Sequence, residues 1–489
     1  MAHLLLAIDN ESLPLRRNLC LYITRPQVRA EPVLTPRRGD PDAPDNAAAH
    51  FYGGVVHEAG RYRMWYYACH WDRGGGPAGV PLLGDLREGP VCYAESGDGV
   101  HWIRPGLGQV EWRGRRDNNI IRLDAAVNEG VHVIRDDEDP DAGRRYKMVY
   151  NDWVPERGFW TVRTATSPDG LAWTDGPRLP FDGFLEQASL YRFRGLYYIA
   201  GQMLLAGEGG HASGRQGFAV VSPDFEHWLQ EYGESFLLPE PSDPAARGCD
   251  KPYEQVHIGV GAASFGNVCV GLYGLWHNRP RLEDKDWFGF GATSGDFGLV
   301  ISNDGLHFRE PVKGHVWLHR DESPCAALPP GVAHGRILCQ GNGILNVGDR
   351  TLIYHGRWAN TADVKDYYAE VALATLPRDR WGALGLFPQA ADGSVWTVPL
   401  TLPRGAQVSL NADGAGGMRV EVADERFALL PAFSGDRAGR LAAPDGLECR
   451  VSWPGPDLAA LAGQTVRLRV RLARGGHAEP RLYAINAGI

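Results

Sequence analysis

Several patterns that would assign this chain to a class of proteins are missing. Its eight cysteines never form a Cys-x-x-Cys pair, and several lie in apolar strand candidates, so we expect reduced core residues rather than a zinc site or a disulfide framework. The net charge is −9 without a long basic run, which argues against nucleic acid or an anionic membrane as a partner. No stretch approaches the roughly 20 apolar residues needed to span a bilayer.

The segment from Met1 to Pro14 also lacks the features of a secretory signal. It contains a short apolar patch, Leu4 to Ile8, without a basic region before it or a small-residue cleavage site after it. Together with the unpaired cysteines, this predicts a cytoplasmic location.

What the chain does contain is a repeat. Five times, a strand rich in aromatic residues is followed by a polar turn with an aspartate and a downstream Trp or Phe, at intervals of about 55 to 80 residues. The turns are Ser96–Trp102, Ser167–Trp173, Ser222–Trp228, Ser302–Phe308 and a degenerate copy, Ala374–Trp381. The strands before them are Arg61–Ala68, Arg145–Tyr150, Gly195–Gln202, Val268–Trp276 and Arg350–Trp358.

This repeat predicts the fold. Asp-Gly favours a tight turn, because glycine accepts positive φ and the aspartate side chain binds nearby backbone amides. The interval suits four-stranded blades, so five copies predict an all-β chain with a five-bladed β-propeller. Chance recurrence of common loop chemistry is the alternative, but it would not supply a matching strand before every copy.

After Trp381 the repeat stops and the pattern changes. Alternating apolar and polar residues, with Gly, Pro and Asp between the runs, predict an antiparallel β-sandwich. Its strand candidates are Val395–Leu402, Gln407–Asn411, Met418–Val422, Glu448–Trp453 and Thr465–Leu472. We therefore expect an N-terminal arm (1–45) that wraps the propeller or closes its last blade, the propeller (46–381), a linker (382–392) and the sandwich (393–489).

The string Arg145-Tyr146-Lys147-Met148-Val149-Tyr150 after an acidic loop, the Ser-x-Asp-Gly turns and the small sandwich resemble the clan of five-bladed glycosidases. This clan includes glycoside hydrolase families 32, 43 and 68 and, more distantly, family 130. The chain is most similar to uncharacterised bacterial proteins labelled family 32-like, which share the tail around Leu410-Asn411-Ala412-Asp413. The Trp-Met-Asn-Asp-Pro, Arg-Asp-Pro and Glu-Cys signatures of family 32 are absent, so the resemblance extends to the fold more than to the mechanism.

The resemblance implies a glycoside hydrolase acting on a small saccharide or glycoside, such as a furanoside. Cleavage requires two facing carboxyl groups, and in a propeller they come from residues just before the inner strands. Glu186 and Glu254 form the best pair, since each precedes an apolar strand and is followed by Gln; the alternative is that they are solvated strand-edge residues. By resemblance, Glu254 is the acid, Glu186 the second carboxylate, and Asp45, Asp117 or Glu129 the third.

Further polar and aromatic residues are candidates for binding the substrate: Asn118, Asn119, Gln187, Gln255, His257, Trp276 and Arg357. Each has a structural alternative. The asparagines can cap a turn, His257 can be a satisfied core residue, and Trp276 can fill a blade instead of stacking on a sugar.

No metal ligands are predicted. The acidic loop Asp136–Asp141 concentrates hard oxygen ligands but lacks the spacing of a calcium loop, so we interpret it as a solvated hairpin. The resemblance leaves room for a structural or channel cation such as calcium, and no other cofactor is expected.

Two other functions remain open. A phosphorylase-like enzyme would need cationic residues around a phosphate, for which Arg215, His355 and Arg357 are available without forming a motif. A non-hydrolytic sugar-binding or biosynthetic protein would explain the missing family signatures. In every case the partner is a small carbohydrate; its identity, the stereochemical course and the oligomeric state stay open.

Overall fold

The computed structural model describes residues 3–72, 80–124, 128–154, 159–180, 185–204, 215–238, 253–278, 293–326, 334–361, 363–474 and 478–488. Strands dominate this part of the chain, which confirms the predicted all-β class. The helical segments within it are short 3-10 turns: η1 (Ala142–Arg144), η4 (Arg320–Glu322), η5 (Val364–Asp366), η6 (Ala415–Gly417), η7 (Pro431–Phe433), η8 (Gly435–Arg437) and η9 (Leu458–Leu461). None of the described helices is long and apolar enough to cross a membrane.

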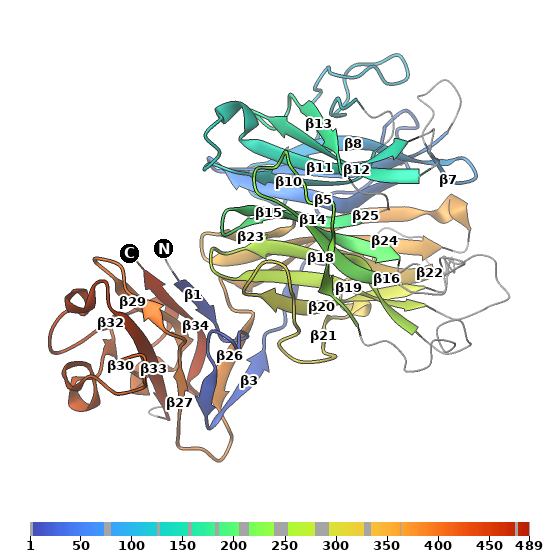
Figure 1. Cartoon of the computed structure of the whole chain (residues 1–489). Helices are drawn as coiled ribbons and strands as arrows, with labels where there is room; N and C mark the ends of the chain where they lie inside the picture. Colours follow the sequence, from blue (N-terminus) through green and yellow to red (C-terminus); the bar gives the residue numbers. More distant parts are fainter. Residues whose placement is uncertain are drawn as a thin grey trace.

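The first three sheets are antiparallel and are built from strands close together in sequence (Figure 1). The first contains β5 (Ala48–Glu58), β6 (Arg61–Trp71), β8 (Leu86–Ser96) and β7 (Val80–Leu83), with β9 (Trp102–Ile103) paired to β8. The second contains β10 (Asn128–Arg135), β11 (Tyr146–Val154), β12 (Phe159–Ser167) and β13 (Thr174–Arg178). The third contains β14 (Glu186–Phe193), β15 (Leu196–Leu204), β16 (Arg215–Ser222) and β17 (Gly233–Phe236).

The next sheet has nine strands and consists of two antiparallel halves. One half contains β18 (Tyr253–Ser264), β19 (Cys269–Asn278), β20 (Ser294–Ser302) and β21 (Val316–Leu318). The other contains β22 (His334–Cys339), β23 (Ile344–Val347), β24 (Arg350–Thr361), β25 (Tyr368–Pro377) and, from the N-terminal part of the chain, β4 (Gln27–Val28). Among the described residues, the two halves share a single strand pairing, the parallel bridge between Gly295 and Ile337, so each half is an antiparallel unit of its own.

One strand from each of the three sheets and from each half of the nine-stranded sheet lies around a common centre. These strands, called the first strands below, are β5, β10, β14, β18 and β23. β10 contacts β5 and β14, β18 contacts β14 and β23, and β23 contacts β5 in turn, so the contacts close into a ring. Asn342, between β22 and β23, forms several of the hydrogen bonds across this ring. Its side-chain oxygen accepts a hydrogen bond from the Leu190 amide at 2.8 Å, and its side-chain nitrogen donates to the carbonyl oxygens of Leu190 (2.8 Å) and Ala262 (3.3 Å). The number of blades remains a prediction.

The four clear Asp-centred turns have the predicted role. In the first, Ser96 Oγ accepts from the amides of Asp98 and Gly99, and Asp98 Oδ1 accepts from the next two amides, each at 2.8 Å. Gly99 has the positive φ, 77°, that the turn requires. The same backbone bonds recur around Asp169, Asp224 and Asp304. The turns follow β8, β12, β16 and β20 and lead to β9, β13, β17 and β21.

The degenerate fifth copy is a different turn. Asp379 itself adopts positive φ, 62°, and its side chain accepts a hydrogen bond from Asn346 at 2.6 Å. The chain then leaves the unit through β26 (Gly382–Leu386), and the outer position on β25 is taken by β4. The turn sequence differs because this unit continues into another sheet.

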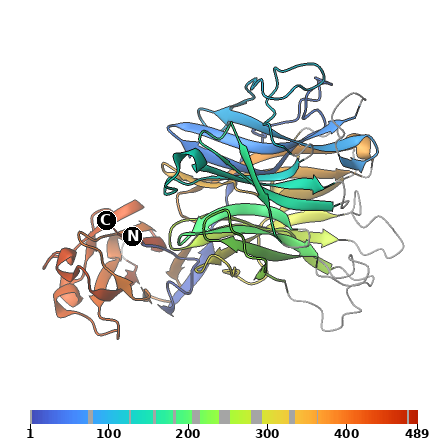
Figure 2. The ribbon, with the colours of Figure 1, turned by 45° about the horizontal axis from the view of Figure 1, so that its top comes forward.

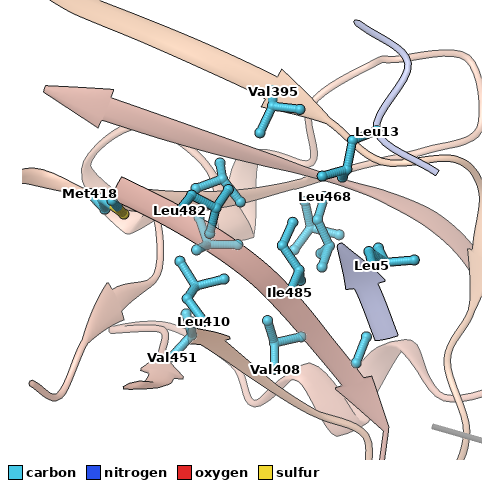
Figure 3. Packing of buried hydrophobic residues seen from close by; sticks show 14 of the residues in the cluster. Leu5, Leu13, Val395, Val408, Leu410, Met418, Val451, Leu468, Leu482 and Ile485 are labelled. Carbon is cyan, nitrogen blue, oxygen red and sulfur yellow. The ribbon is translucent and has the colours of Figure 1, made fainter. Parts of the chain in front are cut away.

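The C-terminal residues form two further antiparallel sheets. One contains β3 (Leu19–Ile23), β26, β34 (Arg481–Gly488), β29 (Gln407–Asp413), β32 (Gly446–Ser452) and β31 (Arg440–Leu441), with β1 (His3–Leu6) on β34. The other contains β2 (Leu15–Arg17), β27 (Asp392–Trp396), β33 (Thr465–Ala473) and β28 (Leu400–Thr401), with β30 (Arg419–Ala423) on β33. Apolar side chains of both sheets share one buried core, including Leu410, Val395, Leu468 and Ile485 (Figure 3).

The N-terminal arm divides between the two parts of the chain. β1, β2 and β3 pair with β34, β27 and β26 of the C-terminal sheets, whereas β4 pairs with β25. Both termini therefore lie on the C-terminal part (Figures 1 and 2). The range expected as a linker, 382–392, contains β26 and the start of β27.

Candidate functional site

Glu186 begins β14 at one end of the ring, and Gln202 binds its carboxylate. The two residues are paired across β14 and β15. The side-chain oxygen of Gln202 accepts a hydrogen bond from the Ile258 amide at 2.6 Å, which directs the Gln202 nitrogen to Glu186, where it donates to Oε2. Because this nitrogen can only donate, the bond favours the ionised form of Glu186.

A bulge in β18 provides the Ile258 amide. The β18–β19 register shifts after His257, and Ile258 and Gly259 have positive φ values of 60° and 89°. A Cβ atom on Gly259 would lie 2.4 Å from the Gly201 carbonyl oxygen, so glycine alone permits this approach. The bulge brings β18 against β15 beside the Gln202 side chain.

Arg215, the first residue of β16, supplies a buried positive charge and is 5% exposed. Its guanidinium donates to His257 Nδ1 at 3.1 Å and lies 4.8 Å from the ring centroid of Trp276. Trp276 in turn packs on His257 with a centroid distance of 4.0 Å. Burial raises the pKa of Glu186, while the Arg215 charge and the Gln202 hydrogen bond oppose that rise.

Glu88 on β8 is a second buried carboxyl group; it is 7% exposed and lies within electrostatic range of Glu186. Burial raises the pKa of Glu88, and the nearby negative charge of Glu186 raises it further. No hydrogen bond to the Glu88 carboxyl group is found among the described residues. The sequence did not indicate Glu88, because it lies within β8 rather than just before a first strand and no motif surrounds it.

Tyr52 lies on the other side of His257. Its hydroxyl is 2.9 Å from His257 Nε2, and the Cys339 thiol approaches it to 3.2 Å. Burial and the Arg215 charge lower the pKa of His257, so its imidazole is neutral. Burial also raises the pKa of the Cys339 thiol to about 12, which keeps it protonated.

Aromatic residues pack around this group. His50 Nε2 is 2.7 Å from the Tyr367 hydroxyl, and the His50 ring stacks on Tyr67 with a centroid distance of 4.8 Å. Trp276 and Trp358 follow, with centroids 6.3 Å apart. Tyr67, Trp276, Trp358 and Tyr367 belong to one buried cluster with Tyr52 and Cys339. Burial is the main reason that the pKa values of both carboxyl groups are raised.

The arrangement brings together two carboxyl groups in unequal environments. Glu186 has a hydrogen-bond donor and a cation beside it, which favour its ionised form. Glu88 is buried next to that negative charge, which favours its protonated form. Such a pair can donate a proton from one residue while the other acts as a nucleophile or base.

Of the other predicted carboxylates, two lie outside the described side chains. Glu129 is in β10 and Glu254 in β18, where it pairs with His277, but only their backbones are described. Asp45 is fully buried and accepts from Arg37 at 2.7 Å and from the Tyr66 hydroxyl at 2.9 Å, with Arg104 2.8 Å away. It therefore joins the N-terminal arm to the first sheet, and the contacts that position it are structural.

Asp117 and its neighbours also have structural partners. The Asp117 side chain is 68% exposed and forms its ion pair with Arg115, two residues away. Asn118 donates to the Val110 carbonyl and accepts from the Ile120 amide, as predicted for a turn cap. Asn119 donates to the Tyr66 hydroxyl and the Tyr93 carbonyl; the Arg37 side chain donates to its oxygen at 3.0 Å.

The predicted ligand-binding residues fall into two groups. His257 and Trp276 lie at the carboxyl pair, and Gln255 accepts the backbone amide of Arg215 at 3.1 Å. Gln187 instead donates to the Gly130 carbonyl at 3.0 Å, which links β14 to β10. Arg357 is 1% exposed and donates to the carbonyl oxygens of residues 29 and 30 and to Ser323 and Glu370. Its donors are thus used in anchoring the N-terminal arm, not in binding a ligand.

Metal binding finds no support in the described residues, which contain no group of three His, Cys, Asp or Glu side chains placed to hold an ion. The acidic loop is not simply solvated. Asp136 is buried beside Lys147 (3.6 Å) and Arg192 (3.3 Å), and Asp139 pairs with Lys147 at 2.6 Å. These cations already neutralise the carboxylates that a calcium ion would need.

Comparisons with known proteins give distant likenesses. No family model matches the chain. An uncharacterized protein of Mycobacterium tuberculosis, Rv1502, is 28% identical over 180 residues, which covers 35% of this chain and 49% of that protein. The chain thus spans about half the length of the curated relatives it matches.

Solved structures of glycoside hydrolases are among those that resemble this chain. A family 43 arabinoxylan arabinofuranohydrolase of Bacillus subtilis has a TM-score of 0.39 and 12% identity, with 94% of this chain and 99% of that chain covered. A family 117 glycoside hydrolase of Zobellia galactanivorans has a TM-score of 0.38 and 14% identity, with 75% and 91% covered. A family 32 β-fructofuranosidase of Bombyx mori has a TM-score of 0.38 and 10% identity, with 94% and 93% covered. At these scores and identities, function has to be argued from the site.

Proposed function

We propose that the chain is a five-bladed β-propeller with a C-terminal β-sandwich, and that it hydrolyses the glycosidic bond of a small saccharide or glycoside at Glu88 and Glu186. The ring of first strands and the antiparallel order of the sheets support the propeller assignment. The observation that carries the functional proposal is the buried pair of carboxyl groups, of which Glu186 alone has a described hydrogen-bond donor and a neighbouring cation.

The unequal environments suggest the two roles. A glycosidase needs one carboxyl group that remains protonated near neutral pH and one that is ionised. Glu88 suits the first role because burial and the Glu186 charge raise its pKa. Glu186 suits the second because Gln202 and Arg215 stabilise its negative charge.

In the proposed reaction, Glu88 gives its proton to the glycosidic oxygen as the bond from that oxygen to the anomeric carbon breaks. Glu186 either attacks the anomeric carbon or removes a proton from the attacking water. In both cases the leaving group departs as a neutral alcohol. Trp276 and the aromatic side chains around His50 offer apolar surface to the CH face of a sugar ring.

Few of the described cationic side chains lie beside the carboxyl pair, which favours a hydrolase over a phosphorylase. Arg357 is occupied in anchoring the N-terminal arm, and His355 is a buried residue bonded to Ser323 at 2.8 Å, with its pKa lowered to about 3 by burial. In the described part of the site, Arg215 then remains as the cation beside the carboxyl pair, and it is bonded to His257. The described residues therefore do not place several cations beside the carboxyl pair, as a phosphate site would require.

The experiment is hydrolysis of a panel of aryl furanosides and pyranosides, with and without phosphate. We expect turnover that does not depend on phosphate. On substrates with a weakly acidic leaving phenol, kcat/KM should fall by about 10³-fold in both Glu88→Gln and Glu186→Gln. Glu95→Gln is the matched control, because Glu95 lies on the same strand as Glu88 but pairs with Arg61. Glu254→Gln tests the acid expected from the family resemblance. Loss of turnover in Glu254→Gln with normal turnover in Glu88→Gln would contradict our assignment.

A further inference from the structure

The contacts of His257 fix the position of its proton. The Arg215 guanidinium has no acceptor atoms, so at 3.1 Å it must donate to His257 Nδ1. Nδ1 therefore carries no hydrogen, and the neutral ring carries its hydrogen on Nε2. His257 Nε2 lies 2.9 Å from Tyr52 Oη, and the bond between them runs from the imidazole to the tyrosine.

Tyr52 consequently accepts on its oxygen from two sides. The second donor is the protonated Cys339 thiol, at 3.2 Å. A phenol oxygen has two lone pairs and one proton, so with both acceptor positions in use only the O–H group remains for another partner. The described residues provide no oxygen or nitrogen acceptor for it, and the thiol sulfur is a weak acceptor.

The Tyr52 hydroxyl also lies within electrostatic range of Glu186. The Glu186 charge contributes to a raised pKa at both Tyr52 and Cys339, after the larger contribution of burial. No hydrogen bond joins Tyr52 to Glu186. The Tyr52 O–H group can therefore donate to a ligand that lies beside Glu186. Tyr52 is 5% exposed, and an unused donor in such a buried place costs free energy unless a ligand accepts from it.

We propose that Tyr52 is a substrate-binding residue whose hydroxyl donates a hydrogen bond to a hydroxyl oxygen of the sugar held beside Glu186, and that Arg215 and His257 act as positioning residues that fix this direction. The inference rests on the proposed function. It identifies the substrate as one with a hydroxyl oxygen facing β5 and predicts that the site rejects the analogue lacking that hydroxyl, because Tyr52 would then be buried without a partner.

The test is a cycle that combines Tyr52→Phe with a series of monodeoxy substrates. We expect Tyr52→Phe to lower kcat/KM by about 10- to 100-fold on the parent substrate. One deoxy substrate should lose a similar factor with the wild type and lose nothing further with Tyr52→Phe. Additive losses for every deoxy substrate would overturn the inference, because a purely structural tyrosine does not recognise one particular hydroxyl.

The matched control is Tyr354→Phe, which removes a buried tyrosine hydroxyl bonded to the Gly99 carbonyl at 2.7 Å. It should keep wild-type kcat/KM on all substrates. A second readout tests the positioning role: nitrogen NMR of labelled histidine, assigned with a His257→Asn variant, should show His257 with its proton on Nε2. A proton on Nδ1 would contradict the proposed direction of the hydrogen bond.

Failure of this inference can be told apart from failure of the proposed function. Wild-type turnover with an unchanged Tyr52→Phe variant overturns the inference alone. If the wild type neither hydrolyses nor, by calorimetry, binds any sugar of the panel, both fall. Binding without hydrolysis that is weakened in Tyr52→Phe would overturn the hydrolytic function and support the role of Tyr52.

Discussion

Replacing Asn342 with alanine should destabilise the ring of first strands. The side chain of Asn342 makes three hydrogen bonds, to the Leu190 amide at 2.8 Å and to the carbonyl oxygens of Leu190 and Ala262 at 2.8 and 3.3 Å. Its own backbone bonds to Gly53 and Val55, at 2.9 Å each, are retained in the variant. The substitution therefore removes the link from β23 to β14 and β18 and leaves the link to β5.

The expected loss follows from these bonds. A net contribution of about 1 kcal/mol for each would give a total of about 3 kcal/mol, and leaving a buried amide without a partner adds to it. Asn342 is itself partly exposed, so water can bind some of the backbone groups that lose their partner, which reduces the loss of stability. We expect the free energy of unfolding to fall by about 2 to 3 kcal/mol.

The assay is urea denaturation followed by tryptophan fluorescence, with the transition of the ring separated from that of the C-terminal sheets by a second probe. Asn346→Ala is the control. Asn346 lies on β23 and is exposed, and its bond to Asp379 joins a turn rather than the ring. A loss below about 1 kcal/mol for Asn342→Ala, or an equal loss in both variants, would refute the reasoning.

Three further predictions follow from the site. Burial raises the pKa of Glu88 in the folded state, so its ionisation lowers the stability of the folded chain as the pH rises above the pKa of Glu88 in the unfolded chain. In thermal denaturation, Glu88→Gln should therefore be more stable than the wild type by about 1 to 2 kcal/mol at pH 8 and should show no gain below pH 4. In the same denaturation assay, Gly259→Ala should lower the free energy of unfolding by about 3 kcal/mol or more, because its Cβ atom would meet the Gly201 backbone. Gly266 has a similar φ of 87° but open space around it, so Gly266→Ala should lower the free energy of unfolding by about 1 kcal/mol. Gln202→Leu should shift the acidic limb of the pH profile of kcat/KM toward higher pH, because Glu186 loses a bond to its ionised form; an unchanged limb would show that Gln202 does not act on Glu186.

The turns could be predicted from the sequence because their chemistry is local. Asp98 binds amides two and three residues away, so the interaction lies within the motif. The same holds for the turn cap at Asn118. The degenerate fifth turn differs because its partner, Asn346, belongs to another strand.

The site could be predicted only in part. Glu186, His257 and Trp276 were found because they lie next to apolar strands where a funnel would open. Glu88 was missed because its significance depends on Glu186, which lies in another sheet. Asp45 was predicted as a third catalytic carboxylate and Arg357 as a substrate-binding residue, but both are bound by residues of the N-terminal arm, which the sequence did not place beside them.

The most direct test of the central claim uses aryl glycosides whose phenol leaving groups span a wide range of acidity. An acidic phenol departs without being protonated, so Glu88→Gln should retain near wild-type kcat on the most acidic phenol and lose about 100-fold or more on the least acidic. Glu186→Gln should be impaired on all of them. An equal loss across the series in Glu88→Gln would contradict the assignment of Glu88 as the proton donor and, with it, the proposed carboxyl pair.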